Sequence, residues 1–380
     1  MKVARLGDIV NNLDSLRIPL NEQERKKMQT QKLYPYVGAN NILDYINDYI
    51  FDEKILCVAE DGGSWGFNEK CSFVLNEKCW VNNHAHVLTA KNGTSLEYLK
   101  YYLNRTNLNK YITGSTRGKL NKSSLNEIKI PLPPLSTQQQ IARILDQADA
   151  LRKKTQQVID LYDQLAQSIF LDMFGDPVRN PKGFSKGVIR DLVSEVKYGT
   201  SSKSDSEGDY AYLRMNNITY SGHMNFTDLK YICLDQKELS KYSVKKGDLL
   251  FNRTNSKELV GKTAVYNRDD MMVIAGYIIR VRMNESGNPH YVWGYLNSRH
   301  GKLVLKNMCK NIVGMANINA QELQDIKILI PPITLQNQFA EKISLIEKQK
   351  ELAKQSLQES ENLFNSLLQK AFKGELVNSV

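Results

Sequence analysis

Apolar positions recur at heptad spacing in two long stretches of the chain. In the first, the steps alternate between three and four residues, at Ile141, Ile144, Ala148, Leu151, Thr155, Val158, Tyr162, Leu165 and Ile169. The second has the same spacing, at Phe339, Ile343, Ile346, Lys350, Ala353, Leu357, Ser360, Phe364, Leu367 and Ala371. Such seams predict two long helices that form a coiled coil with each other. The alternative is two amphipathic helices, each packed on its own domain.

Each long helix follows a repeated segment. "EIKIPLPPLSTQQQIA" (Glu127–Ala142) recurs as "DIKILIPPITLQNQFA" (Asp325–Ala340), and the register continues without a gap to Phe174 and Phe372. In both copies a β-rich run ends in Pro-Pro, which ends a strand and blocks a helix before it. We predict a helix over Ser136–Phe174, with Ser136, Thr137 and Thr334 as N-cap candidates. Gln138 and Gln336 are predicted to fix the Pro-Pro turn.

The blocks that precede the helices also resemble each other. "LGDIV" is matched by "IRDLV", "YPYVGANNI" by "YAYLRMNNI", and "YLKYYLN" by "YVWGYLN". Both blocks read as short strands with turns, and with short helices near Leu96–Asn104 and Tyr291–Arg299. The prediction is an α+β fold with two mixed α/β domains, separated and followed by long helices, with boundaries 1–135, 136–180, 181–333 and 334–380.

The positive charge lies in the two globular blocks. The net charge is +4 over residues 1–135 and +7 over 181–333, against −1 and zero over the two helical segments. Basic blocks favour a polyanionic partner such as nucleic acid. No apolar run approaches the roughly 18 residues of a membrane span, and the N-terminus lacks a leader's apolar core. Five scattered cysteines without a C-x-x-C pair favour a reducing, cytoplasmic location.

The chain lacks the common catalytic motifs. It contains no P-loop, no G-x-G-x-x-G, no H-E-x-x-H and no Asn/Asp-Pro-Pro-aromatic tetrapeptide of adenine methyltransferases. Cys71, Cys79, His84 and His86 match no common zinc spacing, so no metal site is predicted. Asp191, Glu195 and Lys197 resemble a nuclease set, but chance explains such a scatter better. Neither catalytic residues nor a cofactor of the chain's own are expected.

Polar clusters in both blocks are candidates for DNA contacts. Arg pairs with guanine and Asn with adenine in the major groove, and Lys or Arg in flexible loops suits phosphates. In the second block the candidates are Lys203, Arg214, Asn216, Asn217, Arg253, Thr254, Asn255 and Lys257. In the first block they are Asn82, Asn83, His84, Arg117, Lys119 and Lys122. Solvated surface loops are the alternative for each cluster. The loop "AEDGGSWG" (Ala59–Gly66) is the expected counterpart of the loop after Phe251.

With its duplicated Leu-x-x-Ile-x-Ile-x-x-Pro-Pro-x-x-x-Gln-x-x-Ala frame and heptad helices, nearly the whole chain resembles the specificity (S) subunit of type I restriction–modification systems. The resemblance implies two target recognition domains, each reading half of a split sequence in double-stranded DNA. It implies helices packed antiparallel as a spacer and as the dock for two methyltransferase (M) subunits. Catalysis, with S-adenosylmethionine, ATP and Mg²⁺, would lie in the M and restriction (R) subunits.

The predicted helix length suits a spacer. About 39 residues at roughly 1.5 Å each give about 58 Å, enough to separate two DNA contacts by one to two duplex turns. The seam residues above are thus expected at the helix pair or at the partner interface. Two other classes of function remain open: a non-catalytic scaffold that binds protein or RNA, and an enzyme with an unusual site.

Overall fold

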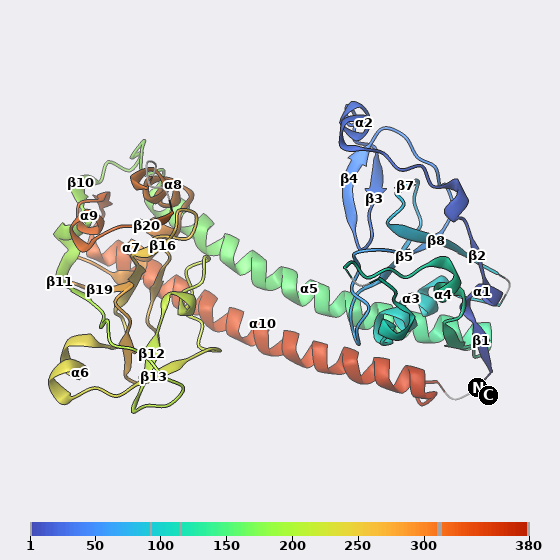
Figure 1. Ribbon diagram of the computed structural model, residues 1–380. Helices are drawn as coiled ribbons and strands as arrows, with labels where there is room; N and C mark the ends of the chain where they lie inside the picture. Colours follow the sequence, from blue (N-terminus) through green and yellow to red (C-terminus); the bar gives the residue numbers. More distant parts are fainter. Residues whose placement is uncertain (1, 92, 115, 310–313, 378–380) are drawn as a thin grey trace. The chain divides into compact units, whose positions relative to one another are not determined.

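The computed structural model describes residues 2–91, 93–114, 116–309 and 314–377 (Figure 1). The chain divides into two compact units, Met1–Thr155 with Ser356–Val380, and Gln156–Gln355. Each unit therefore contains one globular block together with one part of each long helix. Among the described residues, no helix is long and apolar enough to cross a membrane.

The described residues of the first unit form a four-stranded, a three-stranded and a two-stranded sheet. A four-stranded antiparallel sheet has the order β2-β8-β5-β6 (Val10–Asn12, Ala85–Ala90, Ile55–Ala59, Ser72–Leu75). A three-stranded sheet has the order β4-β3-β7 (Ile42–Ile46, Tyr34–Val37, Trp80–Val81). β1 (Val3–Arg5) pairs with β9 (Lys129–Pro131). The short helices are α1 (Leu6–Ile9), η1 (Asp14–Leu16), α2 (Glu22–Lys27), α3 (Leu96–Arg105), η2 (Asn109–Tyr111) and α4 (Lys122–Asn126).

The second unit has matching sheets. Its antiparallel sheet has the order β11-β19-β15-β17 (Val193–Tyr198, Ile278–Met283, Leu249–Asn252, Thr263–Val265). The other has the order β13-β12-β18-β14 (Lys230–Ile232, Tyr210–Leu213, Met272–Ile274, Ser243–Val244). β10 (Ser185–Val188) pairs with β21 (Lys327–Ile330), and β16 (Thr254–Ser256) with β20 (Met315–Asn317). The short helices are η3 (Ile189–Leu192), η4 (Met215–Asn217), α6 (Gln236–Tyr242), α7 (Pro289–Asn297), α8 (Arg299–Met308) and α9 (Ala320–Gln324).

The two blocks share one topology. Strand order β2-β8-β5-β6 corresponds to β11-β19-β15-β17, and the parallel pair β3–β7 corresponds to β12–β18. Strands β5 and β15 are buried at every residue, so they form the centre of each core. The predicted α+β fold with two similar blocks is confirmed, as are short helices near Leu96 and Tyr291.

A buried glutamine fixes the Pro-Pro turn in each unit. The Gln138 amide accepts from the Ser95 N–H at 3.0 Å and donates to the carbonyls of Pro133 and Gly93. Gln336 repeats this, accepting from the Asn288 N–H at 2.9 Å and donating to Pro331 and Ser286. Both side chains are fully buried, so these bonds replace water for the turn's backbone groups. The predicted role of the two glutamines is confirmed.

The predicted N-caps are two to three positions too late. The long helices α5 (Leu135–Phe174) and α10 (Ile333–Lys373) place Ser136, Thr137 and Thr334 inside the first turn. The carbonyls of Pro134 and Pro332 accept the first helical bonds, from the Gln138 and Gln336 N–H groups. Proline can occupy this position because it lacks only the backbone N–H and its carbonyl can still accept the first helical bond. The glutamine side chain donates to the carbonyl of the preceding proline.

Gln336→Leu should destabilise the second unit by about 2–5 kcal/mol, because it leaves one buried N–H and two buried carbonyls without partners. The melting temperature should fall by roughly 5–15 °C in a thermal unfolding experiment. Gln338→Leu, at an exposed position of the same turn, is the matched control. Equal melting temperatures for the two variants would contradict the role of the buried amide.

The long helices pack antiparallel, as predicted. In the second unit, the rings of Phe170 and Phe174 on α5 lie 5.6 and 5.4 Å from that of Phe339 near the start of α10. In the first unit, the Arg152 guanidinium lies 4.8 Å from the ring centroid of Phe364, near the end of α10. Late α5 thus contacts early α10, and earlier α5 contacts late α10.

The predicted seam holds on α10, but on α5 one of its two heptad positions is offset by one residue. On α10 every predicted position is buried or half-buried. On α5, Ile141 and Ala148 are buried and Ile144, Thr155, Tyr162 and Ile169 half-buried, but Leu151, Val158 and Leu165 are 50%, 41% and 44% exposed. Their following neighbours Arg152, Ile159 and Ala166 are the less exposed residues. The same one-residue offset is present at the start of the helix, where Leu145 is fully buried and Ile144 only half-buried, so the packed positions keep a seven-residue repeat in a different phase. The seam assignment of these three residues is therefore wrong.

Lys350, the polar seam residue of α10, joins an ion network. Its buried ammonium contacts Asp163 on α5 and the Nε2 of His223, in the loop after η4. His223 also contacts Asp163 at 2.7 Å and Glu347 at 3.1 Å. Burial favours neutral imidazole, but the bonds to Asp163 and Glu347 outweigh it and raise the pKa of His223. This network connects the second block to both helices. The hydroxyl of Ser360, the other polar seam residue, donates to the Ser356 carbonyl within α10.

His223→Gln should cost more stability at about pH 6 than at about pH 8.5. A raised folded pKa means that the imidazolium stabilises the fold fully below its unfolded pKa, near 6.5, and progressively less as pH rises through the folded value. The expected cost near pH 6 is about 1–3 kcal/mol, since charged hydrogen bonds are lost. Urea unfolding at both pH values measures it, with His300→Gln as a control. An equal loss of stability at both pH values would contradict a charged His223 in this network.

Candidate nucleic-acid interface

One backbone frame recurs beyond the end of the central strand in each unit. After β5, the Leu120 N–H donates to the Glu60 carbonyl at 2.7 Å, and after β15 the Ile318 N–H donates to Arg253 at 2.9 Å. The bridge between Asp61 and Lys119 matches the pairing of Thr254 with Asn317. The expected correspondence of these loops is confirmed. We call Glu60, Asp61, His84, Arg117 and Lys119 the first loop site, and Arg253, Thr254, Asn255 and Asn317 the second loop site.

Glu60 holds two cations in the first loop site. The Arg17 guanidinium donates to its carboxylate at 2.6 Å, and the Lys119 ammonium lies 3.1 Å away. Burial works against ionisation of Glu60, but these bonds outweigh it and place its pKa below the ordinary value. Lys119 remains half exposed, so its position is set while its ammonium still faces solvent.

Asp61 organises the rest of the first loop site. Its carboxylate lies 2.6 Å from the His84 Nδ1 and accepts from Arg117 at 3.1 Å. Arg117 is largely exposed. The structure thus brings three sequence candidates, His84, Arg117 and Lys119, together.

The remaining candidates of the first block are one buried side chain and two exposed ones. Asn82 is buried, and its side-chain oxygen accepts from the His84 N–H at 2.8 Å. Asn83 is exposed in the same turn, and Lys122 is exposed at the start of α4. Asn82 therefore shapes the turn that presents Asn83 and His84.

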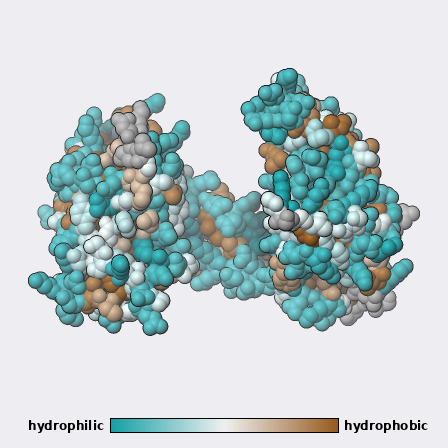
Figure 2. Space-filling view, in the orientation of Figure 1, coloured by the Kyte–Doolittle hydropathy of each residue, from teal (hydrophilic) through white to brown (hydrophobic). Residues whose placement is uncertain are grey.

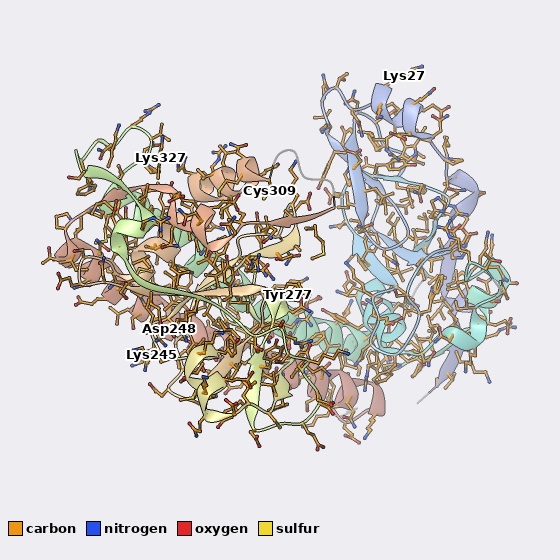
Figure 3. All side chains as sticks on the ribbon, turned by 60° about the vertical axis from the view of Figure 1, so that its left-hand side comes forward. Lys27, Lys245, Asp248, Tyr277, Cys309 and Lys327 are labelled. Carbon is orange, nitrogen blue, oxygen red and sulfur yellow. The ribbon has the colours of Figure 1, made fainter. Side chains whose placement is uncertain are left out.

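Arg253 is the central cation of the second loop site. Its backbone N–H donates to the carbonyl of Tyr277, labelled in Figure 3. Its Nε donates to the Asn317 side chain at 3.2 Å, and its guanidinium lies 4.7 Å from the Tyr198 ring centroid. Among the described residues, its terminal nitrogens Nη1 and Nη2 have no hydrogen-bond partner. The guanidinium is therefore fixed through its Nε, while Nη1 and Nη2 are available to a ligand.

Neighbouring polar side chains complete the second loop site. The Thr254 hydroxyl donates to Asn317 at 3.3 Å, and the Asn255 amide donates to Asn252 at 2.9 Å. Lys257 follows directly after β16 and is half-buried. The structure therefore brings Arg253, Thr254, Asn255 and Lys257 together on one short segment.

Arg214 and Asn217 are committed to their own loop. The Arg214 guanidinium bonds to the carbonyl and carboxylate of Asp228. Asn217 is buried, accepts from the Arg214 N–H, and donates to the carbonyls of Asn225 and Asp228. These bonds give both residues a positioning role. Asn216 is exposed on η4, and Lys203 is exposed in the loop before β12.

Sequence reasoning missed the residues that orient the candidates. Arg17, Glu60, Asp61 and Asn317 hold the loop sites, yet they belong to no recognisable motif. Arg17 is 43 residues from Glu60, and Asn317 is 64 residues from Arg253. Glu60 and Asp61 could have been found from the sequence, because they lie in the segment that was matched to the loop after β15.

The acidic and thiol groups fit ion pairs or core packing better than metal binding. Asp14, Glu60 and His86 offer ligand atoms within 4.8 Å of one another, but the Arg17 guanidinium already contacts Glu60. His86 bonds to Asp14 and to the Leu120 carbonyl through its two nitrogens. Cys71 and Cys79 lie in different core clusters. The zinc set considered in the sequence is not assembled.

The nuclease-like residues are likewise occupied. Glu195 contacts Arg280 at 2.8 Å and Arg282 at 3.0 Å, and Lys197 at 3.2 Å. The Asp191 carboxylate accepts from the Val188 N–H at 2.9 Å. Both carboxylates are thus structural.

Together, the sheet order and the loop frame define a protein with two copies of one α/β domain, each packed with parts of two long helices. The model of the type I restriction modification DNA specificity domain matches residues 1–161 and 181–362. The chain therefore belongs to the type I restriction–modification specificity family.

Individual relatives agree with this assignment. Over 146 residues, 38% of the chain, it is 35% identical to a proposed type I restriction enzyme specificity subunit of Haemophilus influenzae. Over 75% of its length it is 26% identical to the EcoKI specificity subunit of Escherichia coli. The matches span only 37% and 65% of these relatives. The crystal structure of a type I S subunit from M. genitalium shares the fold, with TM-score 0.62, 13% identity, and 97% and 95% of the two chains covered.

Proposed function

We propose that the chain reads a split, asymmetric sequence in double-stranded DNA, one half with each domain, and docks methyltransferase subunits on its helices. The observation that carries this proposal is the repeated loop frame with different side chains on it. Glu60 corresponds to Arg253, Asp61 to Thr254, and Lys119 to Asn317. The same backbone frame with different side chains in each domain suits the recognition of two different half-sites.

The side chains at the loop sites suit base edges. An Arg fork pairs with guanine, Asn with adenine, and carboxylates accept from cytosine in the major groove. Arg117 and Lys119 are exposed cations beside the first loop site, suited to phosphates. The basic excess of both blocks favours DNA over a protein target.

The outer faces of the long helices suit a protein partner. In the second unit, Val158, Leu161 and Leu165 on α5 and Leu345 and Leu352 on α10 are exposed. Figure 2 shows apolar residues among polar ones along the visible part of the helices. Exposed apolar side chains at helical spacing favour a helical partner surface. The residues displaced from the predicted seam thus belong to the proposed partner interface.

In this proposal the chain itself is not catalytic. Methyl transfer lies in the M subunits, two because the helical handle is duplicated, and cleavage lies in R subunits. S-adenosylmethionine, ATP and Mg²⁺ would be bound there. The complex would act on DNA in the cytoplasm.

A salt series tests the proposal against a scaffold or an enzyme. The purified chain is titrated with duplex DNA and with RNA of equal length, between about 50 and 300 mM salt. The expected result is preference for duplex DNA with an affinity that falls linearly on logarithmic axes, and no methyl transfer from S-adenosylmethionine by the chain alone. Preference for RNA, salt-independent binding, or methyl transfer by the isolated chain would contradict it.

A further inference from the structure

Helix α8 gives the second unit a basic helix that has no counterpart among the described residues of the first unit. α7 and α8 are joined by Ser298, whose hydroxyl donates to the Tyr295 carbonyl at 2.6 Å and accepts from the Gly301 N–H at 3.0 Å. In the first unit, the described residues after α3 form only the single turn of η2 before α4. The α8 sequence "RHGKLVLKNM" contains Arg299, His300, Lys302 and Lys306 and no carboxylate.

The cations of α8 share one helix face. Arg299, Lys302 and Lys306 are spaced three and four residues apart, so they lie one above another on the helix. The adjoining stripe carries Leu305 and ends in Cys309, labelled in Figure 3, and both are buried in the core. Arg299 and Lys306 therefore face solvent, while Lys302 lies at the edge of the core and is half-buried.

A groove of about 400 Å³ runs along this face. Tyr220, Lys257 and Glu258 also line it, the last two from the segment after β16, together with the apolar side chains of Val260, Leu303 and Leu305. Four cations thus face one carboxylate. The groove directly continues the segment that carries Arg253, Thr254 and Asn255.

Lys302 is the most desolvated cation in the groove. Its ammonium lies 4.8 Å from the Tyr220 ring centroid. Burial, together with repulsion from Lys262, lowers the pKa of Lys302 to about 8. An anion placed in the groove would offset both effects, since it favours the charged ammonium.

We propose that the α8 groove binds backbone phosphates of the duplex next to the second half-site. The inference rests on the proposed function, because it assumes that the second loop site faces DNA. Phosphate contacts position a protein on DNA and carry no sequence information. The second domain would accordingly supply more of the salt-dependent affinity than the first, while both domains supply specificity.

The test uses the full chain in complex with its methyltransferase partner. The double variant Lys302→Gln/Lys306→Gln is compared with Lys246→Gln, an exposed lysine in a different turn of the same unit, paired with Asp269. Affinity is measured over a salt series for three duplexes: the target, the target altered in its second half, and an unrelated sequence. Lys302→Arg/Lys306→Arg, which keeps the charge, controls for folding.

The double Gln variant should bind all three duplexes roughly tenfold or more weakly, and its log–log salt slope should fall by about 1–2. The Arg variant and Lys246→Gln should keep the original slope. If the original protein binds specifically with a steep salt slope and the Gln variant keeps that slope, the groove proposal is wrong while the proposed function stands. Loss of the methyltransferase subunits from the Gln variant at an unchanged slope would also contradict the groove proposal, because it would assign the groove to a protein partner. Absence of specific DNA binding by the original protein would instead overturn the proposed function.

Discussion

Arg253→Ala should relax recognition of one half of the target and leave the other half intact. The guanidinium is oriented by Asn317 and Tyr198, and its outer edge is open to a base. Loss of one bidentate base contact removes about 1–3 kcal/mol of discrimination, roughly 5- to 150-fold. The measurement is methylation, by the assembled complex, of duplexes altered in one half at a time.

Arg268→Ala is the matched control for this prediction. Arg268 lies in the same unit but pairs with Asp270 in the turn between β17 and β18, away from the loop site. It should leave both halves unchanged. Equal loss at both half-sites in Arg253→Ala, or no loss at either, would count against Arg253 as a base reader.

Leu161→Asp combined with Leu345→Asp should release the methyltransferase subunits without unfolding the chain. The two leucines are 58% and 66% exposed on the outer faces of α5 and α10, so a carboxylate costs little in the free chain. In an apolar interface, each change should cost about 2–4 kcal/mol, which weakens assembly by orders of magnitude. A sizing column detects the loss of the complex, and adenine methylation should disappear with it.

Two controls separate docking from folding. Gln167→Asp introduces the same charge at an exposed polar position of α5 and should leave assembly intact. Ala166→Asp places the charge at a buried position and should unfold the second unit. A complex of unchanged size with the double leucine variant would show that the methyltransferase docks elsewhere.

Much of the architecture could be predicted because it depends on repeated local rules. The Pro-Pro turn, the heptad spacing and the matched segments of the two blocks indicated the duplicated domains and the helix pair. Gln138 could be assigned because a polar side chain just inside a turn has carbonyls within reach. The correspondence between the loops after Ala59 and Phe251 also followed from matching the two blocks.

The parts that could not be predicted depend on packing between distant segments. Leu151 and Leu165 fit a heptad, but the packed heptad position lies one residue later, at Arg152 and Ala166, and both leucines are exposed. Asn82 and Asn217 look like free polar side chains in the sequence, yet tertiary packing buries both. The orientation of Arg253 depends on Asn317, which only the fold brings beside it. A linear pattern records residue type and spacing and contains no information about such contacts.

The central claim is that this chain, through two domains, chooses the DNA sequence that its partner methylates. The most direct test is genome-wide mapping of methylated adenines in cells that contain the methyltransferase partner, with and without this chain. The expected result is a split motif, two short specific blocks around a fixed gap, that appears only when the chain is present. An identical methylation pattern in both cells, with a folded chain and an active partner, would contradict it.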